Sequence, residues 1–340
     1  MTHQPRKRPA TMSDIAREVG VSRTTVSFVL NNHTSSASIP AETKDRILEA
    51  AKKLSYRPNL AAQVLHTNQT HTIGFITDEI ATTPYAVNVI RGAQDAAWAH
   101  GKLLLIVNTG SDATVKEKAV EMMLGRQVEG IIYAAMYHQE VALPANIHEG
   151  SVVLVDCFCA DRSLPSVVPN EIQGGRTATE VLLNKGHRRI GFINNVDPIP
   201  ATFGRLEGYK QALQAYGVPF NEELVRSHPN ESRGGYQGTL ELLHLPEPPT
   251  AIFCFSDFMA MGAIDALRKL GLSVPEDVAV MGFDNYELTA TNLSFSLSTI
   301  ELPHYEMGKW AVEFLLEYSG ESLPPVQHII DCPYIERQSA

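Results

Sequence analysis

From residue 73 onward, short apolar runs alternate with longer amphipathic segments, and this alternation leaves few folds open to the chain. The runs are nearly continuous in apolar residues, as in strands buried on both faces of a parallel sheet. Seven runs are expected to form strands: Ile73–Thr77, Leu103–Asn108, Gly130–Ala134, Val152–Asp156, Arg189–Asn194, Ala251–Phe255 and Val278–Phe283.

The segments between these runs have the apolar spacing of amphipathic helices. The candidates are Tyr85–His100, Val115–Arg126, Gly174–Lys185, Arg205–Tyr216, Gly234–Leu243, Phe258–Leu270 and Tyr305–Tyr318. Alternating strands and helices predict parallel sheets that are covered by helices on both faces. Seven or more strands fit two α/β lobes better than one sheet.

Residues 11–57 carry a different pattern, which predicts three short helices. Thr11 and Asp14 have the spacing of a capping box, so the first helix is expected to begin there. Its inward side comprises Ile15, Ala16 and Val19. Gly20 then provides the residue that ends the helix, because glycine accepts the left-handed conformation of a helix C-cap.

A second helix is expected to begin after Ser22, whose hydroxyl can cap it. Its inward side comprises Val26, Val29 and Leu30. After a polar loop, a third helix presents Ile47, Ala50, Ala51 and Leu54 on one face. Pro58 closes this module, because the residue before a proline avoids the helical conformation.

Residues 59–66 form a further helix candidate that is too short to be stable alone in water. The candidate lies between the two patterns and is followed by the polar residues 67–72. We therefore interpret it as a hinge.

The charges of the chain are divided between its two parts. Residues 1–70 hold ten Lys and Arg against five Asp and Glu, whereas the remainder holds 18 against 33. A basic head on an acidic body suggests that only the head approaches a polyanion.

The composition places the chain among ordinary globular proteins, with 44% hydrophobic and 19% charged residues. No apolar run is long enough to span a bilayer, and the basic residues 6–8 are not followed by the apolar core of a secretory signal. The four cysteines, Cys157, Cys159, Cys254 and Cys332, lack metal-ligand spacing. We expect a cytoplasmic protein with reduced thiols, no bound metal, no cofactor and no membrane partner.

The segment from Thr11 to Asn31 closely resembles the helix-turn-helix of LacI/GalR-type transcriptional regulators, and residues 43–59 resemble their third helix and its exit. Further motifs follow in the family's order, including Arg91-Gly92, residues 186–192, Ser256-Asp257 and residues 282–284. Each motif is weak alone, but the set in this order and spacing is highly specific.

The resemblance implies an N-terminal all-α helix-turn-helix domain at residues 1–58, a hinge at residues 59–70, and an α/β two-lobed effector domain at residues 71–340 with the periplasmic-binding-protein fold. Its N-lobe would span about 71–168 and 302–330, and its C-lobe about 169–301 and 331–340. The implied function is a sequence-specific DNA-binding transcriptional regulator of the repressor type, whose operator affinity responds to a small-molecule effector. The implied assembly is a homodimer.

In the second helix, Thr24 and Phe28 lie opposite the inward side, and Arg23 has the reach to contact a base edge, as arginine does with guanine. The hydroxyl and amide side chains suited to phosphates are Ser22, Thr25, Ser27 and Asn31. Phe28 is equally well explained by a thymine methyl or by packing. In the hinge, the resemblance implies minor-groove contacts by Asn59, Ala62 and Leu65, with Leu65 wedged between base steps.

The resemblance also implies a set of effector-binding residues in the cleft: Asp78, Tyr85, Asp156, Arg205, Tyr236, Ser256 and Asp284. Arginine and aspartate can bind neighbouring hydroxyls, and tyrosine rings suit an apolar sugar face, so a carbohydrate or polyol is expected. The alternatives are a structural Arg205–Asp284 ion pair, and strand-end carboxylates at Asp78 and Asp156 that cap the next turn. We expect His304 to be a packing or surface residue. A nucleobase or other metabolite acting as co-repressor is the second ligand hypothesis.

The sequence does not favour two other functional classes. A transport-linked solute-binding protein would share the body, but the intact head argues against it. An enzyme is not expected, because the sequence has no nucleophile elbow, phosphate-binding loop or metal-ligand spacing.

Overall fold

The computed structural model describes residues 8, 10–31, 38–57, 69–80, 86–110, 112–286, 296–318 and 321–340. The chain divides into two compact units, Met1–Thr70 and His71–Ala340, here called the head and the body. Each unit is described by itself.

The head contains three helices, α1 (Met12–Val19), α2 (Arg23–Leu30) and α3 (Ala41–Lys53). The predicted capping box at Thr11 and Asp14 is confirmed, and Gly20 ends α1 with φ of 77°. The predicted Ser22 cap is also confirmed, since its hydroxyl accepts a hydrogen bond from the Thr25 N–H. The buried core of the head comprises Ile15, Ala16, Val19, Val26, Val29, Ile47 and Ala50.

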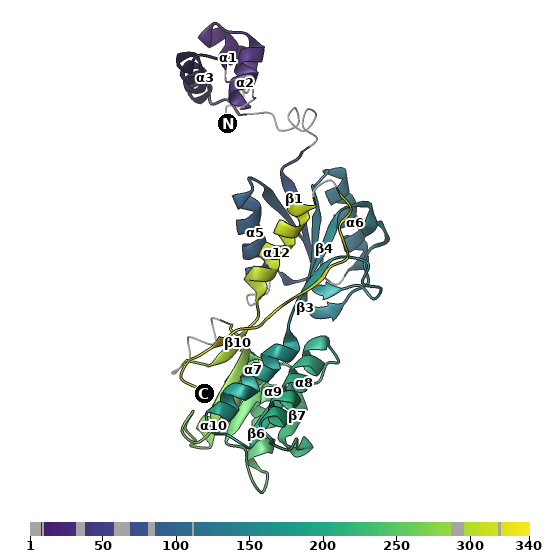
Figure 1. The fold of residues 1–340 in the computed structure, drawn as a ribbon, viewed down its shortest axis with the longest axis vertical. Coiled ribbons are helices and arrows are strands. Elements are labelled where there is room, and N and C mark those ends of the chain that lie inside the picture. Colours follow the sequence, from purple (N-terminus) through teal and green to yellow (C-terminus); the bar gives the residue numbers. More distant parts are fainter. Residues whose placement is uncertain are drawn as a thin grey trace, which may run out of the picture. The chain divides into compact units, whose positions relative to one another are not determined.

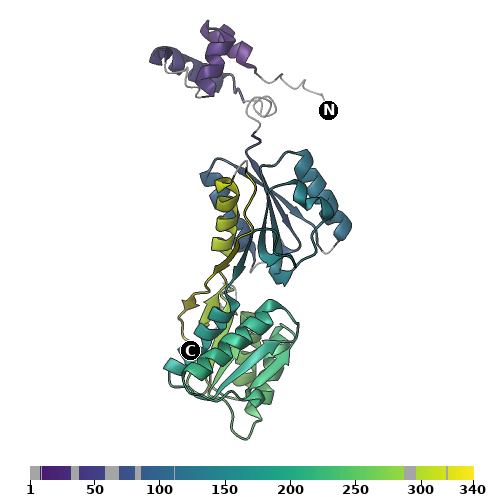
Figure 2. The same cartoon turned by 45° about the vertical axis from the view of Figure 1, so that its right-hand side comes forward.

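The N-lobe of the body is a parallel six-stranded sheet with the strand order β11-β5-β4-β3-β1-β2. Its strands are β1 (Thr72–Thr77), β2 (Leu103–Asn108), β3 (Ile131–Glu140), β4 (Val152–Phe158), β5 (Ser166–Pro169) and β11 (Gln327–Ile330). Its helices are α5 (Val87–Ala99), α6 (Ala113–Gly125) and α12 (His304–Glu317). Successive strand residues bury alternately against α5 and α12 or against α6, so helices cover both faces (Figure 2).

The C-lobe is a second six-stranded sheet with the order β12-β10-β9-β8-β6-β7, in which only the β10–β12 pair is antiparallel. Its strands are β6 (Ile190–Asn195), β7 (Val225–His228), β8 (Ala251–Cys254), β9 (Ala279–Asp284), β10 (Thr299–Glu301) and β12 (Tyr334–Ile335). Its helices are α7 (Glu171–Asn184), α8 (Pro200–Ala215), α9 (Ser232–Leu243) and α10 (Asp257–Lys269). Helix α7 packs on α8, and α9 packs on α10 (Figure 1).

The chain passes between the two lobes after β5, after β10 and after β11. All seven predicted strands and seven predicted helices are present, and their ends agree within three residues except at the end of β3 and the start of α8. The strands outside these seven, β5, β7, β10, β11 and β12, are only two to four residues long. Helix α8 begins at Pro200, five residues before the predicted start, because a proline is well suited to the first turn of a helix.

Candidate functional site

The candidate DNA-binding surface of the head is helix α2. Ser22, Arg23 and Thr24 are exposed at its N-terminal end, whereas Val26 and Val29 are buried. The two helices that pack against α2 are joined to each other, since the Arg46 guanidinium of α3 donates a 2.8 Å hydrogen bond to the Val19 carbonyl at the end of α1. The exposed side of α2 is therefore presented on a fixed support.

The hydroxyl and amide residues of α2 are partly used within the helix. The Ser22 and Thr25 hydroxyls lie 2.8 Å apart, and the Asn31 amide donates a 3.2 Å hydrogen bond to Ser27 Oγ. Phe28 is half-buried. The hinge positions Asn59, Ala62 and Leu65 lie outside the described residues.

The candidate ligand site of the body is a cavity of about 300 Å³ that residues of both lobes line. It lies at the carboxyl ends of the parallel strands, where α/β sheets usually bind their ligands. The described lining comprises Met136, Tyr137, Asp156, Glu171, Asn195, Asp197, Ile199, Ala201, Arg205, Asn230, Phe255, Phe258, Asp284 and Leu302. Three of the predicted effector-binding residues, Asp156, Arg205 and Asp284, are brought together here.

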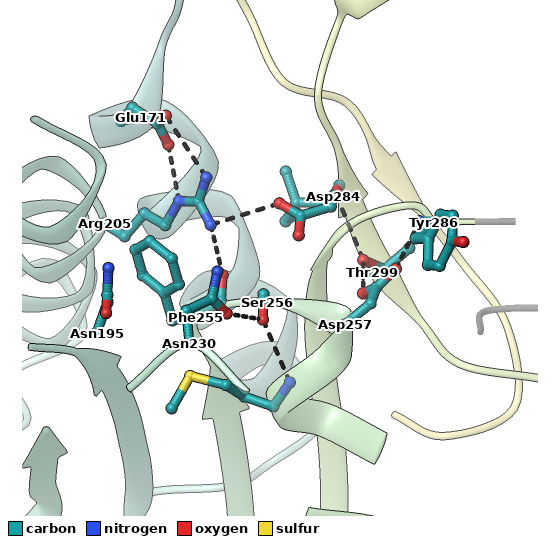
Figure 3. Close-up of polar contacts among 12 residues, drawn as sticks. Glu171, Asn195, Arg205, Asn230, Phe255, Ser256, Asp257, Asp284, Tyr286 and Thr299 are labelled. Carbon is teal, nitrogen blue, oxygen red and sulfur yellow. Dashed lines mark hydrogen bonds and ion pairs between the residues drawn. The ribbon is translucent and has the colours of Figure 1, made fainter. Parts of the chain in front are cut away.

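Arg205 is the central cation of this cavity and is only 3% exposed. Its Nε donates a 2.8 Å hydrogen bond to Glu171 Oε2, and a terminal nitrogen donates to the Phe255 carbonyl (Figure 3). Its guanidinium carbon lies 3.6 Å from the ring centre of Phe283 and 4.3 Å from that of Phe255. The guanidinium is therefore fixed in position by hydrogen bonds at its edge and aromatic rings at its faces.

The close packing of α7 on α8 brings Glu171 and Arg205 together. A Cβ atom at Gly175 would lie 2.4 Å from the Arg205 carbonyl oxygen, and one at Gly204 would lie 2.6 Å from the Glu171 Cβ. Any side chain at these two positions would push the helices apart. The glycines thus place the carboxylate beside the guanidinium.

Asp284 lies at the end of β9 with φ of 109°, and its Oδ1 is 3.6 Å from a terminal nitrogen of Arg205. Burial raises the pKa of Asp284, although Arg205 opposes the shift. Burial likewise raises the pKa of Asp257, whose carboxylate accepts 2.7 Å hydrogen bonds from the Thr299 hydroxyl and the Tyr286 N–H (Figure 3). The two buried carboxyls each disfavour ionisation of the other.

Asp156 faces the cavity from the N-lobe. It is 3% exposed, and its φ of 55° lies in the left-handed region beside an irregularity in the pairing of β3 with β4. Its Oδ2 lies 3.8 Å from His304 Nε2, and its Oδ1 has no hydrogen-bond partner among the described residues. His304 is buried, so the prediction of a packing position holds and that of a surface position does not.

The structure does not bring Asp78, Ser256 or Tyr236 into the cavity lining. Asp78 accepts hydrogen bonds from the Glu79 and Met136 N–H groups, which is the structural role of a strand-end carboxylate. Ser256 caps α10 by accepting from the Met259 N–H. Tyr236 packs instead beneath the Lys269 ammonium, 4.7 Å from its ring centre. Tyr85 lies outside the described residues.

The sequence did not predict several polar residues of the cavity lining. Among them, Glu171 makes the most direct contact with a predicted residue, Arg205. Asn195 ends β6, and Asn230 follows β7, so both stand at strand ends where a cavity was expected. For Asn195, the position directly after a predicted apolar strand was a signal that could have identified it. No local pattern marks Glu171, because its partner Arg205 is 34 residues away.

Within the described residues, no helix has the length and apolar character of a membrane span. Their His, Cys, Asp and Glu side chains form no group of three or more that could hold a metal ion. All four cysteines are buried and unpaired with one another.

Two family descriptions match the chain. Bacterial regulatory proteins of the lacI family match residues 11–59, and the periplasmic binding proteins and sugar binding domain of the LacI family match residues 70–338. Together these matches cover the head and nearly all of the body.

Similar curated proteins are transcription regulators. The chain is 31% identical to the repressor CytR of Escherichia coli K12 over 100% of this chain and 98% of CytR. It is 33% identical to the ribose operon repressor of Haemophilus influenzae over 91% of each chain.

Similar solved structures have the same fold. A lac repressor dimer bound to operator and the anti-inducer ONPF matches with a TM-score of 0.78 and 25% identity, over 98% of this chain and 99% of that one. A putative LacI-family regulator from Rhizobium etli matches with a TM-score of 0.73 and 32% identity, over 79% of this chain and 99% of that one.

A three-helix head followed by a two-lobed body with a polar cavity between its lobes is the domain organisation of a DNA-binding regulator of this kind. The chain belongs to the LacI family of bacterial regulatory proteins, and it is a DNA-binding transcriptional repressor of that family. The predicted family and the predicted fold class are confirmed.

Proposed function

We propose that a small molecule bound in the body cavity changes the affinity of this repressor for its operator. The observation that carries the proposal is the cavity itself, where Asp156 of the N-lobe faces Arg205 and Asp284 of the C-lobe. A ligand that contacts both lobes stabilises one arrangement of them over another. A coupling free energy of ~1–3 kcal/mol is typical of such systems and acts in both directions.

The proposed effector is a carbohydrate or polyol. Carboxylate and amide side chains in the cavity, including Asp156, Asn195 and Asn230, suit the hydroxyls of such a ligand. Phe255 and Phe258 supply apolar surface for its carbon skeleton. In support, relatives carry the names ribose operon repressor and, for a solved structure with 25% identity, CelR–cellobiose complex.

A second candidate is a nucleobase or another metabolite that acts as co-repressor. It is favoured by similar repressors named PurR, for example that of Aliivibrio salmonicida at 30% identity. The two candidates differ in the sign expected of the effect, since a co-repressor strengthens operator binding.

For the DNA contacts, the proposed base reader is Arg23, which is exposed at the start of α2. A bidentate contact from arginine to guanine contributes about 1–3 kcal/mol of discrimination. The proposed phosphate contacts are Ser22, Thr25, Ser27 and Asn31, while Thr24 and Phe28 lie along the same helix.

The proposed assembly is a cytoplasmic homodimer with one head in each half-site. Its domains would be residues 1–58, 59–70 and 71–340, and the hinge residues Asn59, Ala62 and Leu65 would contact the minor groove. The similar lac repressor structure, a dimer bound to operator, supports this assembly.

The test is operator binding by the purified full-length chain, measured by fluorescence anisotropy on sequences selected from a random duplex pool. A panel of neutral sugars, polyols and nucleobases is then added to the complex. We expect a selected duplex to bind at least about a thousandfold more tightly than random DNA, with one panel class shifting that affinity. Equal binding to all duplexes, with and without the panel, refutes the proposal.

A further inference from the structure

The body cavity holds far more acid than base. Four carboxyl side chains line its described part, at Asp156, Glu171, Asp197 and Asp284, whereas Arg205 is the one arginine or lysine in that lining. Opposite charges interact strongly at short range in a site shielded from water, and like charges repel as strongly. Burial raises the pKa of Asp284, but even without its charge the three other carboxyl groups outnumber the single guanidinium, so the ligand enters a cavity with excess negative charge.

The single guanidinium is already committed to partners in the protein. Arginine has five N–H donors, and Arg205 directs its Nε and one terminal nitrogen to the two oxygens of Glu171, at 2.8 and 3.5 Å. The other terminal nitrogen donates to the Phe255 carbonyl and lies 3.6 Å from Asp284 Oδ1. This leaves the guanidinium paired by its own carboxylates before any ligand arrives.

Within the described residues, Glu171 forms no ion pair other than the one with Arg205, and its side chain is 5% exposed. A phosphate or carboxylate on a ligand would have to share this guanidinium with Glu171, whose charge already offsets it. Glu171 would then lie buried beside a second anion, which is costly. Glu171 thus makes Arg205 a poor anion receptor.

The buried atoms of the cavity that lack a hydrogen-bond partner are acceptors, so they call for donors on the ligand. Asp156 Oδ1 and Asn195 Oδ1 are both buried acceptors without a partner among the described residues, and each residue is 3% exposed. A buried polar atom without a partner costs free energy, so a ligand gains by supplying hydrogen-bond donors at these positions. Hydroxyl and ammonium groups are such donors, whereas ionised phosphates and carboxylates are acceptors.

We propose that this cavity selects polyols by charge: it takes neutral or amine-bearing compounds that donate to Asp156, and it rejects their phosphorylated or acidic counterparts because Glu171 neutralises Arg205. This inference rests on the proposed carbohydrate or polyol effector and adds the charge class of that effector. A protonated amine gains further, since it offsets the excess of carboxyls.

The test is the affinity of the full-length chain for matched sets of compounds, measured by isothermal titration calorimetry and native mass spectrometry. Each set holds one sugar skeleton in neutral, amine-bearing and anionic form, such as galactose, galactosamine and galactose 6-phosphate, with glucose and ribose sets beside it. We expect a neutral or amine-bearing member to bind at least about tenfold more tightly than its anionic counterpart. An anionic member that binds as tightly as its neutral counterpart overturns the proposal.

Two variants test whether Asp156 and Glu171 cause the preference for neutral or amine-bearing ligands. Asp156→Asn is expected to weaken the best ligand at least about tenfold, because the amide presents one acceptor in place of a carboxylate. Glu171→Gln is expected to reduce the preference for the neutral over the anionic member at least about tenfold, since it frees the charge of Arg205. The control is Glu207→Gln, which removes an exposed carboxylate from the helix that carries Arg205, and it should leave both affinities unchanged.

The outcomes separate this inference from the proposed function. If no compound of any charge binds, the sugar effector is wrong and the charge selection falls with it. If an anionic compound is the best ligand and shifts operator affinity, the sugar effector stands and the charge selection is wrong. If Glu171→Gln fails to fold, as judged by its thermal unfolding, the proposal is decided by the unchanged chain alone, through the ratio of its affinities for the neutral and the anionic compound.

Discussion

The head and the body build their functional surfaces over very different distances in the sequence. In the head, the side-chain hydrogen bonds of α2 join residues three or four positions apart, as Ser22 does with Thr25 and Asn31 with Ser27. In the body, Arg205 meets a carboxylate 34 positions earlier and a carbonyl 50 positions later. The side-chain contacts of α2 are local, whereas the body cavity exists only once two lobes have folded.

The two units also differ in how deeply their functional residues are buried. Arg23 and Thr24 are exposed, since a DNA groove must reach them from outside, whereas Arg205 and Asp156 are each 3% exposed. A small ligand needs enclosure, and enclosure commits the same side chains to the stability of the fold. Substitutions at the cavity should therefore cost stability and binding together, whereas those on the surface of the head should cost binding alone.

Arg205→Ala tests this difference with the largest expected effect. It leaves Glu171 buried without its cation, so we expect the free energy of unfolding of the body to fall by about 3–5 kcal/mol and the ligand response to be lost. Both tryptophans, Trp98 and Trp310, lie in the body, so urea unfolding followed by their fluorescence reports on that unit.

The matched control for Arg205→Ala is Arg176→Ala on the neighbouring helix α7. Arg176 pairs with Glu180 at 2.7 Å but is 51% exposed, so its loss should lower the free energy of unfolding far less than the loss of Arg205. Equal costs for the two arginines would show that the depth of burial does not govern stability in the body.

The local construction of the head explains why its structure could be predicted from sequence. The Thr11–Asp14 capping box, the Gly20 end and the Ser22 cap each need only residues within one turn. The individual strands and helices of the body could also be predicted, since apolar runs indicate its strands and amphipathic segments indicate its helices. The short strands β7 and β10 carried too few apolar residues for such a pattern.

The cavity was only partly predictable, because its side chains are brought together by packing over long sequence distances. The resemblance to a family pointed to Asp156, Arg205 and Asp284, which line the cavity. It gave no sign of Glu171, which the glycine-mediated approach of α7 and α8 sets beside Arg205. It also pointed to Tyr236, whose ring packs by Lys269 outside that lining.

Ile15→Ala asks whether the small head is as vulnerable in its core as the body is in its cavity. Ile15 is fully buried, and truncation of such a side chain costs about 2–5 kcal/mol. A unit of this size has little stability to lose, so we expect α1 to α3 to exchange their amide hydrogens rapidly and operator binding to vanish. Hydrogen-exchange mass spectrometry of the full chain measures both units at once.

The control for Ile15→Ala is Leu48→Ala, which truncates a side chain that is 51% exposed on α3. The amide exchange of the Leu48→Ala variant should stay near that of the unchanged chain. Faster exchange in the body of Ile15→Ala would contradict the independence of the two units.

Arg23→Ala tests the claim that surface residues of the head act on binding alone. We expect discrimination between operator and random duplex to fall by about 1–3 kcal/mol, because the guanine contact is lost, with no change in unfolding. Nonspecific binding and its dependence on salt should largely persist. Anisotropy titrations at several salt concentrations separate the two.

The comparison for Arg23→Ala is Arg17→Ala, which removes the same charge from α1, where the side chain is 81% exposed. It should weaken all duplexes alike. If Arg23→Ala does the same, Arg23 contacts phosphate and not a base.

Thr11→Ala has the smallest expected effect and tests how local the stability of the head is. The Thr11 hydroxyl accepts a 3.3 Å hydrogen bond from the Asp14 N–H and donates one of 2.7 Å to Asp14 Oδ2, so its loss removes half of the capping box. We expect the head to lose about 1 kcal/mol of stability, the usual cost of removing an N-cap side chain. Faster exchange should be confined to the first turn of α1 if the cap acts locally, and Thr11→Ser should restore slow exchange because it keeps the hydroxyl. Faster exchange throughout α2 and α3 would instead mean that the head unfolds as one unit, and its construction from local signals would then not extend to its energetics.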